Sequence, residues 1–156
     1  MTSCAIASQL KPLPIVDWPL RKQKRWTGYV WSNRRLPPPE GSAGKDAQLL
    51  DKALEDRQVV MVPVVLTELL SDPKLPSGVA ETLSEVPLIE IGSGYWQRAG
   101  VLRAKVLAKR RRARLGDALI AQSCIDQGVP LLTRDRDFRA FAEAQDLDLV
   151  LGFELD

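Results

Sequence analysis

Histidine is absent from this sequence of 156 residues. Its absence excludes Ser/His/Asp and Cys/His nucleophilic sites, as well as metal sites built on imidazole. Cysteine is scarce, because Cys4 and Cys124 are the only two and stand far apart. They have no second pair, so a disulfide framework and a four-thiolate zinc site are excluded too. Any hydrolytic chemistry in this chain must therefore depend on carboxylates.

Long apolar stretches are also missing. The sequence has no run of about 18 apolar residues, and its N-terminus lacks the basic start, apolar stretch and small-residue cleavage site of a secretory signal. We therefore expect a cytoplasmic protein that is not associated with a membrane. The net charge of +2 is too small to identify a nucleic-acid binder. An apolar content of 45% over this length is enough for one domain with a core.

The first 44 residues show little periodic pattern. They contain six prolines and carry seven Lys or Arg against two acids. The pattern changes at residue 45, where good helix formers and regularly spaced apolar residues begin. We interpret 1–44 as an atypical, loosely patterned N-terminal segment and 45–156 as the folded domain.

Helices and strands alternate from residue 45 onward. Short β-branched runs suit strands that are covered on both faces, and Gly128 is placed to end the preceding helix. The pattern predicts an α/β fold with a mostly parallel central sheet flanked by helices on both faces. The predicted helices cover 45–56, 63–70, a stretch beginning at Tyr95, 116–127 and 138–144, and the predicted strands cover 59–62, 88–91, 129–133 and 147–151.

Four acids stand where such a sheet builds its sites, just beyond the carboxyl ends of its strands. They are Glu68, about one helical turn beyond the strand at 59–62, Asp117 in the first turn of its helix, and Asp135 and Asp137 after a strand. Each alone has a structural explanation, because an acid is favoured at a helix start and ordinary on an exposed helix face. Glu68 and Asp117 stand in apolar sequence, where a buried carboxylate needs a cation. If these acids converge, Mg²⁺ or Mn²⁺ is the natural partner for an all-oxygen ligand set.

Three strings of sequence resemble bacterial VapC-type PIN-domain toxins. GDALIA at 116–121 and GVPLLTRDRDF at 128–138 resemble their C-terminal half, and VPVVLTELL at 62–70 resembles their central motif. The order and spacing agree over about residues 45–150. The resemblance implies a PIN-like fold and an acidic metal site that contains Glu68, Asp117 and Asp135, with Asp137 as a further candidate.

The resemblance also implies an activity and partners. It implies cleavage of single-stranded or looped RNA by a water molecule that Mg²⁺ or Mn²⁺ activates, so a general-base histidine is unnecessary. It further implies the toxin component of a type II toxin-antitoxin system, with a cognate antitoxin protein as its partner. By analogy with the family, a homodimer is expected.

The first acidic motif of that family has no clear counterpart. It ends the first strand and is followed by Thr or Ser, whereas Asp17 is followed by Trp and Pro. Residues 26–30 resemble the start of the family's first helix, which would place the missing acid near Lys22. We interpret residues 1–24 as a replaced terminus or the product of a shifted reading frame, and keep Asp17 as a candidate metal ligand. A site with three acids would hold the metal less well and cleave weakly or not at all.

A run of cations precedes Asp117 without an intervening acid. This run could bind RNA phosphates. It could equally be a solvated helix end, where the helix dipole stabilises cations. Both interpretations stay open. Arg134 and Arg136 flank Asp135 and are further candidates for phosphate contact. The run consists of Arg98, Arg103, Lys105, Lys109, Arg110, Arg111, Arg112 and Arg114, of which Arg110, Arg111 and Arg112 are the main RNA-binding candidates.

Three functions remain open at this point. The first is a metal-dependent endoribonuclease. The second is a catalytically weakened PIN-fold protein that binds RNA or an antitoxin without cleavage, for which the missing first motif is direct support. The third is an unrelated α/β phosphohydrolase with an aspartate nucleophile directly after its first strand, a position that Asp17 fits poorly because Trp and Pro follow it.

Overall fold

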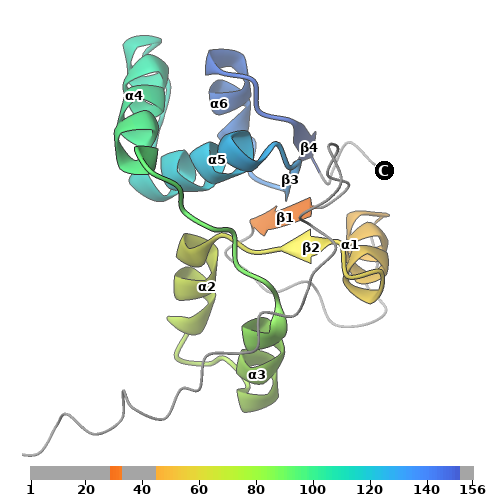
Figure 1. Cartoon of the computed structure of the whole chain (residues 1–156). Coiled ribbons are helices and arrows are strands. Elements are labelled where there is room, and N and C mark those ends of the chain that lie inside the picture. The colour runs from red at the N-terminus through yellow and green to blue at the C-terminus, as the bar shows by residue number, and fades with distance from the viewer. Residues whose placement is uncertain (1–28, 33–44, 152–156) are drawn as a thin grey trace, which may run out of the picture.

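The computed structural model describes residues 29–32 and 45–151 of the chain. Its centre is a four-stranded sheet in the order β2-β1-β3-β4 (Figure 1). All three strand pairings are parallel, which confirms the predicted parallel sheet. The strands are β1 (Tyr29–Ser32), β2 (Val59–Val60), β3 (Leu131–Thr133) and β4 (Leu149–Leu151).

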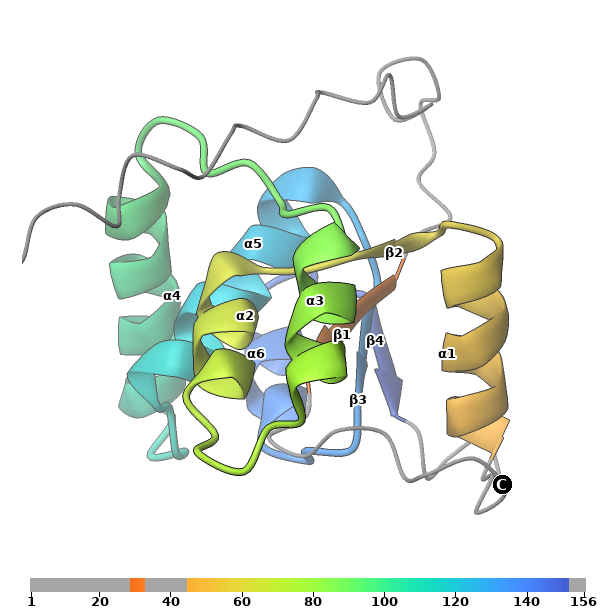
Figure 2. The ribbon, with the colours of Figure 1, turned by 90° about the horizontal axis from the view of Figure 1, so that it is seen from below.

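The helices lie on both faces of this sheet. In Figure 2, α1 stands on one side of the strands and α5 and α6 on the other. Within the described ranges, no helix is both long enough and apolar enough to span a membrane. The helices are α1 (Lys45–Glu55), α2 (Pro63–Leu70), α3 (Ser77–Glu85), α4 (Tyr95–Ala108), α5 (Leu115–Gln127) and α6 (Phe138–Ala144).

Two apolar clusters, one on each face, hold the helices to the sheet. Neighbouring residues of a strand point to opposite faces. Val59 and Leu132 pack against Leu50 of α1, whereas Val60 and Leu131 join the larger cluster formed with α2, α4, α5 and α6. Each fully buried aliphatic side chain contributes about 2 kcal/mol to folding. The predicted covering of both faces is therefore confirmed.

Local sequence signals explain where several helices begin and end. Pro63 starts α2, where the missing N–H is no loss because the first turn has no intrahelical acceptor for it. Gly128 ends α5 in the left-handed conformation at a φ of 62°, as its position predicted. The predicted bounds of α2 and α6 agree with the structure.

Two other elements differ from the prediction. The predicted strand at 88–91 was wrong, because only an isolated bridge between Met61 and Leu88 is formed. Leu88 and Ile91 are exposed, and Ile89 alone of the apolar residues in this segment is buried. The helix α3 was not predicted, because its two larger apolar residues, Val79 and Leu83, are only half-buried and give a weak stripe.

The placement of a helix start at 26–30 was also wrong for the residues that the structure describes. Tyr29–Ser32 form β1, which lies between β2 and β3, with Ser32 opposite Thr133. Aromatic and β-branched residues in this segment favour a strand. The expected place of the first acid therefore moves from Lys22 to the end of β1. No acid follows Ser32 before Glu40, so β1 is not followed directly by the aspartate that the aspartate-nucleophile alternative requires.

Candidate active site

Asp117 is the most enclosed of the predicted acids. It lies in the first turn of α5 and is only 6% exposed, beside the buried Ala118 and Ile120. Its Oδ2 atom is buried and accepts no hydrogen bond within the described parts of the chain, although the residue makes another polar contact. A charged carboxylate in such surroundings is costly unless a cation or hydrogen-bond donors face it.

Glu68 approaches the start of α5 from α2. A Cβ atom on Gly116 would lie 3.4 Å from Oε1 of Glu68, so this carboxylate rests over the residue directly before Asp117. The expectation that Glu68 is buried was wrong: Val65 and Leu69 form the buried stripe of α2, and Glu68 lies beside it in solvent. The structure thus combines one buried and one accessible carboxylate at the start of α5.

Asp135 and Asp137 lie in the turn after β3. The N–H of Asp135 donates to Oγ1 of Thr133 at 3.1 Å, and Oδ1 of Asp135 accepts the N–H of Asp137 at 2.9 Å. These bonds fix the Asp135 carboxylate at the carboxyl edge of the sheet. Oδ2 of Asp137 lies 4.0 Å from Nη1 of Arg112, so Asp137 faces the basic segment before α5.

The expected convergence of three or four acids is not present. Across residues 29–32 and 45–151, no three acidic or thiol side chains lie close enough together to hold a metal ion. Asp17 lies outside the described residues. The chemistry of the donors still fits Mg²⁺ or Mn²⁺, because Glu68, Asp117 and Asp135 offer only carboxylate oxygens, the ligands that hard cations prefer. Of these, Glu68 and Asp117 are brought to the same turn of α5.

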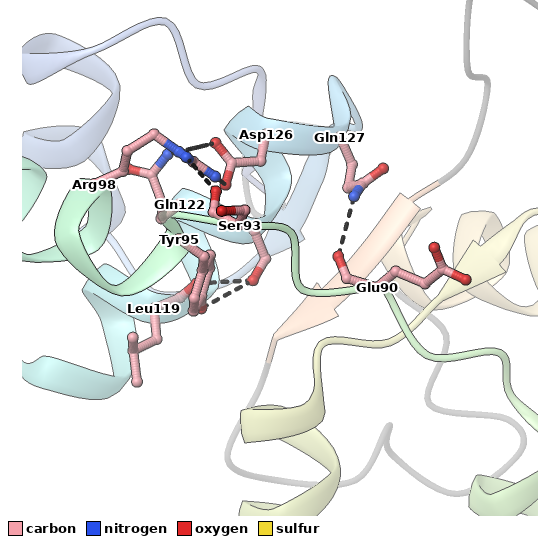
Figure 3. Close-up of polar contacts among 9 residues, drawn as sticks. Glu90, Ser93, Tyr95, Arg98, Leu119, Gln122, Asp126 and Gln127 are labelled. Carbon is pink, nitrogen blue, oxygen red and sulfur yellow. Dashed lines mark hydrogen bonds and ion pairs between the residues drawn. The ribbon is translucent and has the colours of Figure 1, made fainter.

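Two of the cations before Asp117 have structural roles. Arg98 donates to both carboxylate oxygens of Asp126, at 3.0 and 2.7 Å, and to the carbonyl oxygen of Ser93 at 2.8 Å (Figure 3). The hydrogen bonds to Asp126 raise the pKa of the Arg98 guanidinium. Nε of Arg103 donates to the carbonyl oxygen of Ala113 at 3.0 Å. These two arginines therefore anchor α4 to the chain around α5.

Polar contacts also fix α5 on α4, as Figure 3 shows. Oη of Tyr95 donates to the carbonyl oxygen of Leu119 at 2.7 Å, and Oγ of Ser123 lies 3.1 Å from the same phenol oxygen. Burial raises the pKa of the Tyr95 phenol, which the hydrogen bond with Ser123 partly opposes. Because Leu119 is two residues beyond Asp117, this contact also positions the buried acid.

Arg110, Arg111 and Arg112 are exposed at the α4–α5 connection. An open pocket of about 390 Å³ lies between this connection and α6. Arg134 is exposed in the turn after β3 and does not line the pocket. Arg139, on α6, also lines the pocket and was not among the residues predicted from the sequence. The pocket is lined by Arg111, Arg112, Arg136, Asp137, Arg139, Ala140 and Glu143.

Comparison with known proteins finds the same fold. The family model of the PIN domain matches residues 42–144. Among solved structures, VapBC-5 of Mycobacterium tuberculosis, a member of the VapBC family of toxin-antitoxin systems, is similar at 20% identity with a TM-score of 0.58, covering 80% of this chain and 97% of that chain. No curated protein sequence matches significantly.

Two structures of the Fit proteins are also similar. FitAB bound to an IR36 DNA fragment matches at 16% identity with a TM-score of 0.61, covering 82% of this chain and 97% of its own. FitAcB from Neisseria gonorrhoeae matches at 17% identity with a TM-score of 0.58, covering 80% and 98%. At identities this low, the likeness to solved structures is evidence for the fold alone.

Proposed function

The chain belongs to the PIN domain family, and from this premise we propose that it is a metal-dependent endoribonuclease, the toxin of a type II toxin-antitoxin system. The observation that carries the proposal is the buried carboxylate of Asp117, which directly follows the glycine over which Glu68 lies. In the proposed hydrolase, which has no histidine, a divalent cation held by these carboxylates would activate water.

We propose that Glu68 and Asp117 would hold the cation, Mg²⁺ or Mn²⁺, and that Asp135, which forms no three-acid group with them within the described residues, would complete the ligand set by approaching them. When bound, the cation supplies a water of lowered pKa and neutralises charge on the phosphate. Asp117 provides a rigid carboxylate, since the Tyr95 contact holds α5 in place. Glu68 is exposed, so its carboxylate would be the ligand accessible from solvent. Asp135 is oriented by the N–H of Asp137, which occupies one of its oxygens.

The proposed partners are a cognate antitoxin and a second copy of the chain, and the proposed location is the cytoplasm. The similarity in fold to a member of the VapBC toxin-antitoxin family supports the first of these. An antitoxin is physically reasonable for a nuclease whose substrate is cellular RNA, because unrestrained cleavage would be harmful to its own cell.

Cleavage of a mixed RNA substrate by the purified protein tests the proposal. We expect cleavage that requires Mg²⁺ or Mn²⁺ and that the Asp117→Asn variant abolishes. Asp146→Asn is the matched control, because Asp146 is an exposed aspartate in the loop before β4. Circular dichroism establishes that both variants are folded. Equal cleavage by the wild type and Asp117→Asn would contradict the proposal.

A specific observation favours a second candidate, a PIN-fold protein that binds RNA or an antitoxin without cleavage. The strand β1 ends at Ser32 and the sequence directly beyond it has no acid before Glu40, so the first acid of the family's site does not directly follow this strand. Calorimetric titration with Mn²⁺ separates the two functions. Folded protein that binds RNA but no Mn²⁺ would favour the second candidate, and weaker Mn²⁺ binding by Asp17→Asn would show that Asp17 supplies the missing ligand.

A further inference from the structure

The pocket between the α4–α5 connection and α6 combines four arginines with two acids. We propose that this site, the arginine pocket, binds a phosphodiester group of the RNA strand; the choice of RNA as the ligand rests on the proposed function. Its volume of about 390 Å³ falls within the range of ligand sites in proteins. The four arginines are Arg111, Arg112, Arg136 and Arg139, and the two acids are Asp137 and Glu143.

The ion pairs inside the pocket are long and exposed. Nη2 of Arg111 lies 3.8 Å from Oε2 of Glu143, with side chains 60% and 55% exposed. Nη1 of Arg112 lies 4.0 Å from Oδ2 of Asp137, with side chains 69% and 34% exposed. Both distances exceed the hydrogen-bond range, and exposed pairs of this kind contribute less than about 1 kcal/mol. A phosphate group can therefore accept hydrogen bonds from these guanidinium groups at a small cost in free energy, because only weak ion pairs are lost.

The two walls of the pocket are joined to each other. Nζ of Lys109, at the end of α4, donates to the carbonyl oxygen of Glu143 at 2.9 Å. Nζ of Lys105 donates to Oε1 of Gln145 at 3.2 Å. These contacts fix the end of α4 against the end of α6, so the arginines of the two walls face a space that exists before a ligand enters.

The arginine pocket adjoins the candidate acids. Asp137 lines the pocket, and its N–H is bonded to Oδ1 of Asp135 at 2.9 Å. Arg112 precedes Asp117 by five residues on the other wall. The carboxylates of Asp135 and Asp137 repel the RNA backbone, whereas four guanidinium groups in the pocket attract it. The neighbouring charges thus direct an RNA strand past the acids.

Binding of a short fluorescent single-stranded RNA, measured by anisotropy in the presence of a chelator, tests the arginine pocket without cleavage. We expect Arg111→Ala and Arg139→Ala to weaken binding several-fold. Each should also lower the slope of log affinity against log salt by about 0.7, the value for one phosphate contact on a single strand. The control is Lys52→Ala, an exposed cation on α1, across the sheet, whose removal should change neither quantity.

Replacing one acid should have the opposite effect. Glu143→Gln removes a negative charge and the carboxylate that faces Arg111, while the backbone carbonyl that binds Lys109 stays. We expect this variant to bind RNA more tightly than the wild type. Poor folding would weaken RNA binding, so it cannot produce the tighter binding expected of Glu143→Gln. This variant therefore tests the proposal even if an arginine variant is unstable.

Unchanged RNA affinity in Arg111→Ala, Arg139→Ala and Glu143→Gln would overturn the proposal. Arginine-dependent binding of inorganic phosphate, with RNA binding unaffected, would overturn it in favour of a small-anion site. Arginine-dependent binding of polyglutamate alone would instead identify a site for an acidic protein segment. If RNA cleavage is absent but binding changes as expected, only the nuclease proposal fails. If cleavage depends on Asp117 but RNA affinity is unchanged in the arginine variants, only the proposal of the arginine pocket is contradicted.

Discussion

Gly116 shows how a single residue leaves room for the candidate metal site. Its backbone needs no left-handed conformation, because its φ is not positive. The added Cβ of any other residue would instead contact Oε1 of Glu68 at 3.4 Å and Cγ1 of Val64 at 3.9 Å. The missing side chain therefore keeps the space between the Glu68 carboxylate and α5 open to a cation.

The Gly116→Ala variant distinguishes an effect of Gly116 on cation binding from an effect on the stability of the fold. We expect thermal unfolding to show unchanged or slightly higher stability, since Ala is favoured over Gly inside a helix by about 1 kcal/mol. We expect Mn²⁺ affinity, measured by calorimetry, to fall because the methyl group fills the space beside Glu68. Wild-type Mn²⁺ affinity in this variant would argue against a cation at this position.

Cys124 makes the stability of the protein depend on pH in the alkaline range. It is buried in the core, and burial raises the pKa of its thiol above the ordinary value of 9.0. The Cys124 thiol has a higher pKa in the folded protein than in the unfolded protein. Its contribution to the free energy of unfolding is therefore complete below about pH 9 and is lost as the pH rises further. Tyr95, whose pKa is also raised by burial, acts in the same direction above about pH 10.

We therefore expect chemical unfolding of the wild type to show a free energy that falls as the pH rises from 9. Cys124→Ala should be less stable at neutral pH, by about 1 kcal/mol for the lost packing, but should lose less stability between pH 9 and 10. Parallel curves for the two proteins over this range would contradict the assignment of the effect to Cys124.

Polar contacts help to hold α5 in position against α4. Tyr95 is 2% exposed, and its hydroxyl joins α4 to the carbonyl of Leu119. Tyr95→Phe should lower the free energy of unfolding by about 1–2 kcal/mol, because the hydroxyl of Ser123 also loses a buried partner. Gln97→Ala, on the exposed side of α4, is the control for urea denaturation. Equal midpoints for the two variants would show that the phenol contact contributes nothing.

Elements with strong local patterns were predictable from the sequence, and those set by distant contacts were not. Residues 63–70 and 138–144 carry their own apolar stripes, Pro63 marks the start of the first, and both helices were predicted with the observed bounds. Residues 29–32 become β1 by pairing with β3, about a hundred residues further along the chain, which no local window contains. Residues 88–91 have a strand-like pattern but only one bridge partner, so they form no strand.

The candidate site was predictable to a similar extent. The alternation of strands and helices correctly placed Asp135 after β3 and Asp117 in the first turn of α5. The exposure of Glu68 was not predictable, because it depends on how α2 is rotated about its axis against the core. The arginine pocket lies between the α4–α5 connection and α6, which are separate segments of the chain. The proximity of such segments leaves only a weak signal in the sequence.

At the scale of the whole molecule, the small net charge of +2 conceals a separation of charges. The acids assigned to the cation stand at α2, the start of α5 and the turn after β3, while arginines crowd the neighbouring pocket. The proposed nuclease uses both parts, since the acids are proposed to bind the cation and the arginines to bind the polyanion. Weak overall charge is therefore compatible with RNA binding that depends strongly on salt.

The most direct test of the central claim is the initial rate of Mn²⁺-dependent RNA cleavage by Glu68→Gln, compared with Glu81→Gln. Both residues are exposed glutamates on helices, α2 and α3, but only Glu68 lies over Gly116. If the carboxylates at the start of α5 hold the cation, Glu68→Gln loses cleavage and Glu81→Gln keeps the wild-type rate. Equal rates for the two variants would contradict a metal site built on Glu68.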